Sequence, residues 1–385
     1  MYSRRTGWDL AETAYAAAVR EAREAGRTLL DLTGSNPTRC GIAYDRASVM
    51  GPLADAEALE YDPEPRGLLA ARDAVSEYYA DHGADVGTDQ LILTASTSES
   101  YSFLFQLLCD PGDEVLFAQP SYPLFDFLAA LDDLTLLSYP VFHDHGWWID
   151  FAELERRIGP RTRAIVVVNP NNPTGHWTSE PERERLREIC ARCGLALIVD
   201  EVFLDYPLAP EGGRGRSFAS GASSVSTFVL SGLSKVVGLP QMKAAWIAAL
   251  GPDPERTQVL ERLEVIADTF LSVSSPVQLA MPSWLRGRGA IQGQVLERIR
   301  GNLQLLEEFA ARCPDRLHVL APAAGWSAVL SLPGCGGNEQ CAERLVRERG
   351  VVVHPGSFYG MAGANRAVVS LLTPPAVLVE AVGRL

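Results

Sequence analysis

The stretch Ala164-Ile-Val-Val-Val-Asn-Pro-Asn-Asn-Pro-Thr-Gly175 decides the fold of this chain. Its β-branched run predicts a buried strand, and the Asn, Pro and Gly that follow predict a rigid turn. A helix-length segment, Glu180–Cys193, comes next and leads into a second apolar run, Ala196–Asp200. Strand, helix and strand in this order indicate two parallel strands joined by a helix.

The same alternation continues on both sides of this stretch. Further apolar runs predict buried strands, with helix-length segments such as Ser98–Cys109 between several of them; these runs are Leu91–Thr94, Glu114–Phe117 and Thr227–Leu230. The pattern indicates an α/β domain with a mainly parallel sheet. After about residue 280, helical patterns flank shorter strands, which suits a smaller α+β domain. We therefore expect a large domain at residues 46–280 and a small domain formed by residues 1–45 and 281–385.

Composition and charge narrow the class of protein. With 47% hydrophobic and 21% charged residues, the chain has the composition of a soluble globular protein. Its net charge of −14 disfavours nucleic acid and anionic membranes as partners. The N-terminus has no apolar core of a signal peptide, and no apolar run is long enough to span a bilayer. We expect a cytoplasmic protein.

The seven cysteines are odd in number and scattered, which is typical of reduced cytoplasmic thiols. Cys190 and Cys193 form one Cys-x-x-Cys pair, but no further ligands stand at a suitable spacing nearby. The sequence therefore predicts no metal site.

Lysine use is unusually sparse. Lys235 and Lys243 are the two lysines among 34 basic residues, and the other 32 are arginines. A guanidinium group does not act as an amine nucleophile, whereas a lysine amine can form an imine with a carbonyl group. Codon bias could leave two lysines by chance, but both lie in one apolar, Gly/Ser-rich stretch, Val229–Lys243. This clustering indicates imine chemistry at Lys235.

Other polar residues fall where the predicted strands end. Ligands of open α/β sheets bind beyond the carboxyl ends of the strands. The Thr94–Ser98 segment opens a helix and could bind a phosphate, although it also fits a simple helix cap. Likewise, the acid at the end of the 196–200 run could be structural. The candidate residues are Ser96, Thr97 and Ser98, Tyr122 between two prolines, Asn172 in the polar turn, and Asp200.

The candidate phosphate segment, aromatic residue, polar turn, acid and lysine follow one another in this order along the sequence. In this order the chain resembles the class I/II aminotransferases of fold type I, which are aspartate-aminotransferase-like pyridoxal-phosphate (PLP) enzymes. The resemblance covers essentially the whole chain. Its most specific pieces are the Asn172-Pro-Thr-Gly175 turn, Asp200-Glu201 at a strand end, and Ser234-Lys235. It implies the α/β fold of PLP-dependent transferases, with a large domain around a mainly parallel sheet and a small α+β domain.

The resemblance also implies roles for these residues. Lys235 would hold PLP as an aldimine and then transfer the substrate proton. Asp200 would pair with the protonated pyridine nitrogen of the cofactor. Tyr61 would reach the phosphate of the neighbouring subunit, which implies a homodimer with shared active sites. The remaining implied contacts are Asn172 with the ring oxygen, Tyr122 stacked on the ring, and Ser96, Thr97, Ser98 and Ser234 with the phosphate.

The chain departs from the family pattern at three cofactor positions. Phe203 stands where the family usually has a tyrosine three residues after the aspartate, so its hydroxyl is missing unless another, such as that of Tyr206, replaces it. Gly232 replaces the first serine of the family's Ser-x-Ser-Lys. Lys243 replaces the phosphate-binding arginine, and its ammonium group cannot donate two hydrogen bonds in a fork as a guanidinium does.

The substrate carboxylate also lacks an obvious partner. The family places an arginine two residues before a serine in a late strand, and relative to Ser370 that position is Val368. Arg366 lies two residues further back, on the same face of the strand. We predict that Arg366 binds the substrate carboxylate, with Arg39 or backbone donors as the alternative. Further substrate-pocket candidates by family position are Gly34, Trp177 and Trp326.

Two functions remain open from the sequence. The first is an aminotransferase that acts on an α-amino acid and a 2-oxo acid. The alternative is a PLP-dependent lyase, cyclase or oxidase on the same scaffold, as occurs in secondary metabolism, because the cofactor site departs from the family. A PLP-binding regulator is disfavoured, since the family-like segment Asp31–Gly34 begins too early for a preceding DNA-binding domain.

Overall fold

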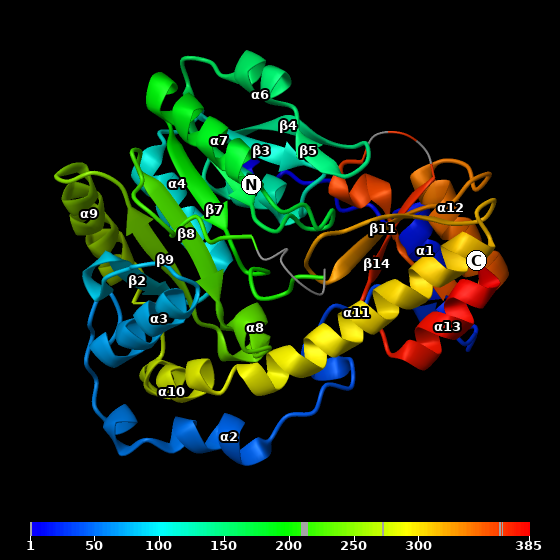
Figure 1. The fold of residues 1–385 in the computed structure, drawn as a ribbon, viewed down its shortest axis with the longest axis horizontal. Coiled ribbons are helices and arrows are strands. Elements are labelled where there is room, and N and C mark those ends of the chain that lie inside the picture. The colour runs from blue at the N-terminus through cyan, green and yellow to red at the C-terminus, as the bar shows by residue number, and fades with distance from the viewer. Residues whose placement is uncertain (1, 209–214, 272, 362, 364) are drawn as a thin grey trace.

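The computed structural model describes residues 2–208, 215–271, 273–361, 363 and 365–385. An eight-stranded sheet lies at the centre of the larger part of the molecule (Figure 1), in the order β2-β9-β8-β7-β6-β3-β4-β5. The bounds of its strands are β2 Leu91–Thr94, β3 Glu114–Gln119, β4 Thr135–His143, β5 Trp147–Ile149, β6 Thr162–Val168, β7 Ala196–Asp200, β8 Thr227–Gly232 and β9 Ala245–Leu250.

The predicted α/β class with a mainly parallel sheet is confirmed. Strands β4, β3, β6, β7 and β8 pair in parallel, whereas β9 runs antiparallel to both β8 and β2, and β5 runs antiparallel to β4. The predicted helix is α7, Glu180–Cys193. It begins where Ser179 and Glu182 cap each other's backbone N–H groups, and it ends at Gly194 in the left-handed conformation.

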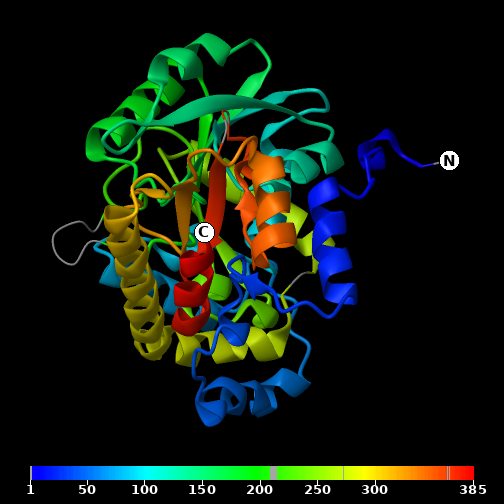
Figure 2. The same ribbon diagram turned by 90° about the vertical axis from the view of Figure 1, so that its right-hand side faces the viewer.

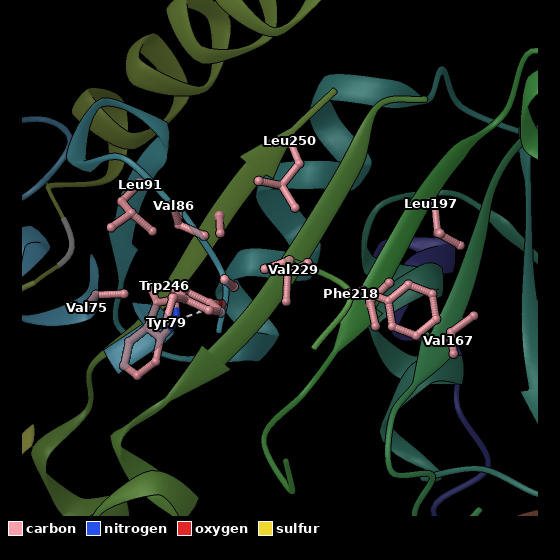
Figure 3. Packing of buried hydrophobic residues seen from close by; sticks show 14 of the residues in the cluster. Val75, Tyr79, Val86, Leu91, Val167, Leu197, Phe218, Val229, Trp246 and Leu250 are labelled. Atoms are coloured by element: carbon pink, nitrogen blue, oxygen red, sulfur yellow. Dashed lines mark hydrogen bonds between the residues drawn. The ribbon is translucent and has the colours of Figure 1, made fainter. Parts of the chain in front are cut away.

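Helices cover both faces of this sheet. One face buries residues of α3 (Leu69–Asp81), α7 and α10 (Ser275–Arg286), as Figure 3 shows for part of the cluster. Trp246 and Tyr79 lie fully buried within it, and the Trp246 Nε1–H donates to the Tyr79 hydroxyl at 3.1 Å. The other face buries residues of α4 (Thr97–Leu108), α5 (Leu124–Leu131) and α9 (Glu255–Phe270). Each large apolar side chain removed from water stabilises the fold by roughly 1.5–3 kcal/mol.

A second, four-stranded sheet has the order β10-β11-β14-β13 and is antiparallel throughout. It shares a core with helices from both ends of the chain, and α1 lies beside α12 (Figure 2). A two-stranded parallel ladder, β1 with β12, joins the two ends. The bounds are β1 Leu30–Asp31, β10 His318–Leu320, β11 Ser327–Ser331, β12 Val351–Val352, β13 His354–Pro355 and β14 Arg366–Ser370, with helices α1 Ala14–Glu24, α11 Gly289–Arg312, α12 Asn338–Arg344 and α13 Pro375–Arg384.

The domain limits at residues 46–280, and at 1–45 with 281–385, stay a prediction. Two features cross them. Trp284 and Leu285 of α10 belong to the core of the large sheet, and the loop after β7 contributes Phe203 and Tyr206 to the core of the small sheet.

The cysteines differ from the prediction in one place. Cys335 and Cys341 form a disulfide, so the expectation of reduced thiols is wrong for this pair. Two glycines, Gly336 and Gly337, follow Cys335 and allow the chain to turn back onto the first turn of α12. Cys190 and Cys193 are free thiols.

The predicted cytoplasmic location stays a prediction.

Within the described part of the chain, no helix is long and apolar enough to cross a bilayer. The same residues hold no cluster of three or more His, Cys, Asp or Glu side chains suited to a metal ion.

Candidate active site

A cavity of about 460 Å³ lies at the carboxyl edge of the parallel strands. Ten of the residues singled out from the sequence for cofactor binding and catalysis line it, and they come from segments that follow five different strands. They are Ser96, Thr97, Ser98, Tyr122, Asn172, Asp200, Phe203, Ser234, Lys235 and Lys243. The tertiary structure therefore brings together residues that are up to 147 positions apart.

The register of β9 explains why two of these segments meet. Ala245, the first residue of β9, pairs with Thr94 at the end of β2 and with Gly232 at the end of β8. The Ser96–Ser98 segment therefore lies close to the Ser234–Lys235 segment. Lys243, two residues before Ala245, enters the cavity from the same side.

Lys235 lies on α8, the short helix Leu233–Val236. Its Nζ is 4.8 Å from the ring centroid of Trp326 and 5.5 Å from that of Phe203. Burial lowers the pKa of Lys235 to about 8, although the carboxylate of Asp200 acts in the opposite direction. The unprotonated amine, which is the form that attacks a carbonyl carbon, is therefore far more populated near neutral pH than in an ordinary lysine.

Asp200 closes β7 and is 8% exposed. Its Oδ2 accepts a hydrogen bond of 3.2 Å from the Tyr101 hydroxyl, and its Oδ1 accepts one of 3.1 Å from the Val202 N–H. Burial raises the pKa of Asp200 to about 6, against the effect of these two donors and of Lys235. The carboxylate is thus held in place and favours a positively charged partner in the cavity.

The N-terminus of α4 provides an anion site. Ser96 caps this helix, and its hydroxyl accepts a hydrogen bond from the Glu99 N–H at 3.2 Å. The N–H groups of Thr97 and Ser98 have no partner within the helix, because the first turn lacks preceding carbonyl groups. These groups and the positive end of the helix dipole suit a phosphate.

Gly232 leaves no room for the serine that the sequence resemblance leads us to expect at this position. A Cβ atom there would lie 2.8 Å from the Ala245 Cβ and 3.0 Å from the Ala244 carbonyl oxygen. The close pairing of β8 with the start of β9 therefore excludes a side chain. Ser234 remains as the hydroxyl of this segment in the cavity.

Phe203 lines the cavity, whereas Tyr206 does not. Phe203 lines the cavity and packs edge-on against Trp326, with the ring centroids 5.5 Å apart. The Tyr206 hydroxyl donates instead to the main-chain oxygen of Lys235. It is therefore not free to replace the hydroxyl that Phe203 lacks.

Asn172 and Tyr122 both line the cavity. The Ser327 hydroxyl donates to Asn172 Oδ1 at 3.4 Å, which leaves the amide N–H groups of Asn172 to donate to a bound ring oxygen. Tyr122 is 43% exposed, so its ring face is available to a flat ligand. Tyr61 is 76% exposed and lies outside the cavity of its own chain, beside a separate depression.

Glu201, next to the aspartate, is 1% exposed and holds two loops. It accepts hydrogen bonds from the Ser217 hydroxyl at 2.6 Å, the Phe218 N–H at 2.7 Å and the Asn169 side chain at 3.3 Å. It thereby fixes the loop after β6, which carries Asn172, to the end of β7.

The residues predicted for substrate binding do not gather here. Arg366 lines a separate cavity, where its guanidinium bonds the Ser331 hydroxyl, and Val368 lines the catalytic cavity instead. The physical reason is that Arg366 begins β14, two residues further from the cavity than Val368. The placement of Arg366 does not support its predicted contact with the substrate carboxylate, and that contact stays a prediction.

The other substrate candidates divide in the same way. Arg39 and Gly34 are exposed and do not line the catalytic cavity, although Thr33 and Ser35 beside Gly34 do. Trp177 lines another depression, whereas Trp326 lines the catalytic cavity.

Sequence reasoning missed several residues of the site. Tyr101, Thr33, His354 and Tyr359 all line the cavity. Tyr101 had a signal, since it lies one helical turn after Ser98 on the helix that opens with the phosphate segment. Thr33 follows β1, whereas His354 and Tyr359 lie in β13 and in the segment after it, so their place in the cavity depends on strand pairing between distant parts of the chain.

The residues present fit PLP. An amine of lowered pKa, a buried carboxylate, a helix N-terminus with free N–H groups and an exposed aromatic face all border one cavity. They match, in order, the aldehyde, the pyridine nitrogen, the phosphate and the ring of this cofactor.

Comparison with known proteins gives the same result. The family "Aminotransferase class I and II" matches residues 46–385. The glutamate-pyruvate aminotransferase AlaA of Haemophilus influenzae is 27% identical over 290 residues, covering 75% of this chain and 71% of that protein. The alanine aminotransferase of Mycobacterium tuberculosis is 29% identical over 273 residues, covering 70% of this chain and 63% of that protein.

Among solved structures, the alanine aminotransferase of Pyrococcus furiosus superposes with a TM-score of 0.90 at 23% identity, covering 100% of this chain and 98% of that one. A double mutant of Thermus thermophilus aspartate aminotransferase superposes with a TM-score of 0.86 at 25% identity, covering 100% and 98%. The family match, which extends over most of the chain, shows that this protein belongs to the class I and II aminotransferases, PLP-dependent transferases of fold type I.

Proposed function

We propose that this aminotransferase transfers an amino group between an α-amino acid and a 2-oxo acid, and that alanine and pyruvate form one such pair. The observation that carries the proposal is the position of Lys235. Its amine, with a pKa lowered to about 8, shares the cavity with Asp200 and the α4 N-terminus. The names of similar proteins, glutamate-pyruvate and alanine aminotransferase, support the choice of alanine and pyruvate.

PLP supplies an electron sink for the bond that breaks at the substrate Cα. The residues of this chain supply the rest. The Lys235 amine would accept the proton from the substrate Cα and return it to the C4′ carbon of the cofactor. Asp200 would hold a positive charge at the ring nitrogen of PLP, because a buried carboxylate is most stable beside a cation.

Other residues orient the cofactor. The N–H groups of Thr97 and Ser98, the hydroxyl of Ser234 and the ammonium group of Lys243 would hold the phosphate. The Asn172 amide would donate to the ring oxygen, and Tyr122 would cover the ring face.

We also propose that the enzyme is a homodimer in which Tyr61 completes the site of the neighbouring subunit. Its 76% exposure, and its position outside the cavity of its own chain, support this role. Other exposed apolar side chains on nearby segments suit a contact between subunits; they are Leu59, Leu69, Phe270 and Leu271.

Half-reactions test the proposed activity. Purified holoenzyme is mixed with single amino acids, and the loss of its yellow absorption identifies the donors. Pyruvate or another 2-oxo acid should then restore the absorption. A lyase, cyclase or oxidase would instead turn over its substrate with no 2-oxo acid present, and that result would reject transamination as the activity.

A further inference from the structure

His354 and Val368 are direct cross-strand neighbours on β13 and β14. Both line the catalytic cavity. Val368 occupies the position at which the sequence resemblance leads us to expect an arginine for the substrate carboxylate, and it is 2% exposed. The residue opposite this missing arginine therefore carries a basic side chain of its own.

The His354 ring is held in a defined orientation. Its Nδ1 lies 3.0 Å from the Tyr359 hydroxyl, which also belongs to the cavity lining. When Tyr359 donates to Nδ1, the proton of a neutral imidazole resides on Nε2, and Nε2 becomes a hydrogen-bond donor. No partner for Nε2 occurs among the described residues.

The basic side chains that line the cavity also favour His354 as an anion-binding group. Its basic lining, within the described ranges, consists of Lys235, Lys243 and His354. Lys235 is needed for imine formation, and Lys243 flanks the phosphate segment. Arg366 lines another cavity, and Arg39 is exposed outside this one. Among the basic side chains of the lining, His354 is therefore the one available to bind an anion other than the phosphate.

We propose that His354, oriented by Tyr359, contacts the α-carboxylate of the amino acid and replaces the arginine absent at position 368. This inference rests on the proposed function, because it assumes an α-amino acid substrate. An imidazole donates one hydrogen bond, whereas arginine donates two in a fork, so carboxylate binding is weaker and depends on the protonation of His354.

The groups around His354 set this dependence. Burial lowers the pKa of His354, and the carboxylate of Asp31 on β1 acts in the opposite direction. Tyr359 and Tyr15 of α1, whose hydroxyl donates to the Val353 carbonyl oxygen, stay neutral because burial raises the pKa of both phenols. Since the protonated imidazole adds charge to the hydrogen bond, affinity for the amino acid should increase as the pH falls through the titration of His354.

Steady-state kinetics of the holoenzyme with alanine as donor tests the proposal. His354→Ala should raise KM for alanine by roughly tenfold, as expected for the loss of one hydrogen bond to a charged group, with a smaller effect on kcat. His354→Gln should retain part of the affinity but lose the pH dependence. Ethylamine, which lacks the carboxylate, should react equally with the wild-type enzyme and both variants.

Three further variants sharpen the test. Arg366→Gln should leave KM for alanine unchanged, and so should His143→Gln, a half-buried histidine of the other cavity. Val368→Arg in the His354→Ala background should restore affinity. If that protein does not fold, the single His354 variants still decide the matter.

The outcomes separate the two proposals. A wild-type enzyme that reacts with no amino acid and 2-oxo acid rejects the proposed function. An active enzyme whose KM for alanine is the same in His354→Ala rejects the role of His354 alone. A raised KM in Arg366→Gln with none in His354→Ala would return the carboxylate site to Arg366.

Discussion

The Tyr206 hydroxyl donates a hydrogen bond of 2.5 Å to the main-chain carbonyl oxygen of Lys235. Tyr206 is fully buried and packs edge-on against Trp326, with ring centroids 4.9 Å apart. Its hydroxyl thus fixes the backbone at Lys235. Phe203, three residues earlier, lines the cavity without a hydroxyl. The tyrosine of this segment therefore contacts the backbone of Lys235 and does not line the cavity.

Phe203→Tyr should shift the pH titration of the bound cofactor. A phenol hydroxyl at this position would donate to the ring oxygen of PLP, stabilise its negative charge and make the protonated yellow form easier to deprotonate. The midpoint of the yellow absorption in a spectrophotometric titration should therefore fall, by about one pH unit for a hydrogen bond of ~1.4 kcal/mol. An unchanged midpoint would mean that another group already reaches this oxygen.

Lys235→Ala and Lys243→Ala should separate two roles. The Lys235 variant should bind PLP without a covalent link and lose turnover, because the arginines of the chain cannot form the imine. The Lys243 variant should keep the covalent link but release PLP more readily, because one cation near the phosphate is lost. Borohydride reduction followed by peptide mapping locates the modified lysine. Phosphopyridoxyl on Lys243 in the wild-type protein would reverse the assignment.

Asp200→Ala should retain PLP and lose rate. Without the buried carboxylate, the positive charge at the ring nitrogen is no longer stabilised, and the electron sink weakens. We expect a loss of roughly a thousandfold in kcat, equivalent to about 4 kcal/mol. Tyr101→Phe provides a matched control, since it removes one of the donors to Asp200 and keeps the carboxylate. Near-wild-type activity of Asp200→Ala would leave this acid a structural role only.

Tyr61→Phe and Lys235→Ala subunits should complement each other. In a mixed dimer with shared sites, one site carries both changes and the other carries neither. Mixing the two inactive or impaired proteins under exchange conditions should therefore restore up to half of the wild-type activity per hybrid dimer. An enzyme that sediments as an active monomer at assay concentration contradicts the shared site.

The His82–Asp205 pair should make stability depend on pH. His82 Nε2 lies 3.0 Å from Asp205 Oδ1, and the Tyr78 hydroxyl donates to Asp205 Oδ2 at 3.1 Å. Burial alone would lower the pKa of His82, but Asp205 and the Tyr78 carbonyl outweigh it and raise the pKa above 6.5. The stabilisation is therefore complete below the pKa of the unfolded chain and is lost as the pH rises through the folded-state pKa.

His82→Asn tests this dependence. Thermal unfolding should show the variant less stable than the wild type by about 1–2 kcal/mol at low pH, with the difference shrinking at alkaline pH. A constant difference across the pH range would show that the protonated form of His82 contributes nothing.

The α/β class could be predicted from the sequence, and so could ten of the residues that line the candidate site. These elements are local patterns, because their periodicity and their capping residues can be recognised from neighbouring positions; examples are the apolar runs at 164–168 and 196–200 and the helix at 180–193. The reactive lysine and the residues that end each strand could be found in the same way, because parallel strands bring their carboxyl ends to one edge.

Which groups of the small sheet line the cavity became known only from the tertiary structure. His354 and Val368 are neighbours because β13 pairs with β14. Arg366 lies two residues before Val368 on β14 and lines a different cavity. The Tyr206 hydroxyl and the exclusion of a side chain at Gly232 likewise depend on contacts across the fold. Such contacts join residues far apart in the chain, and neither composition nor local periodicity carries information about their register.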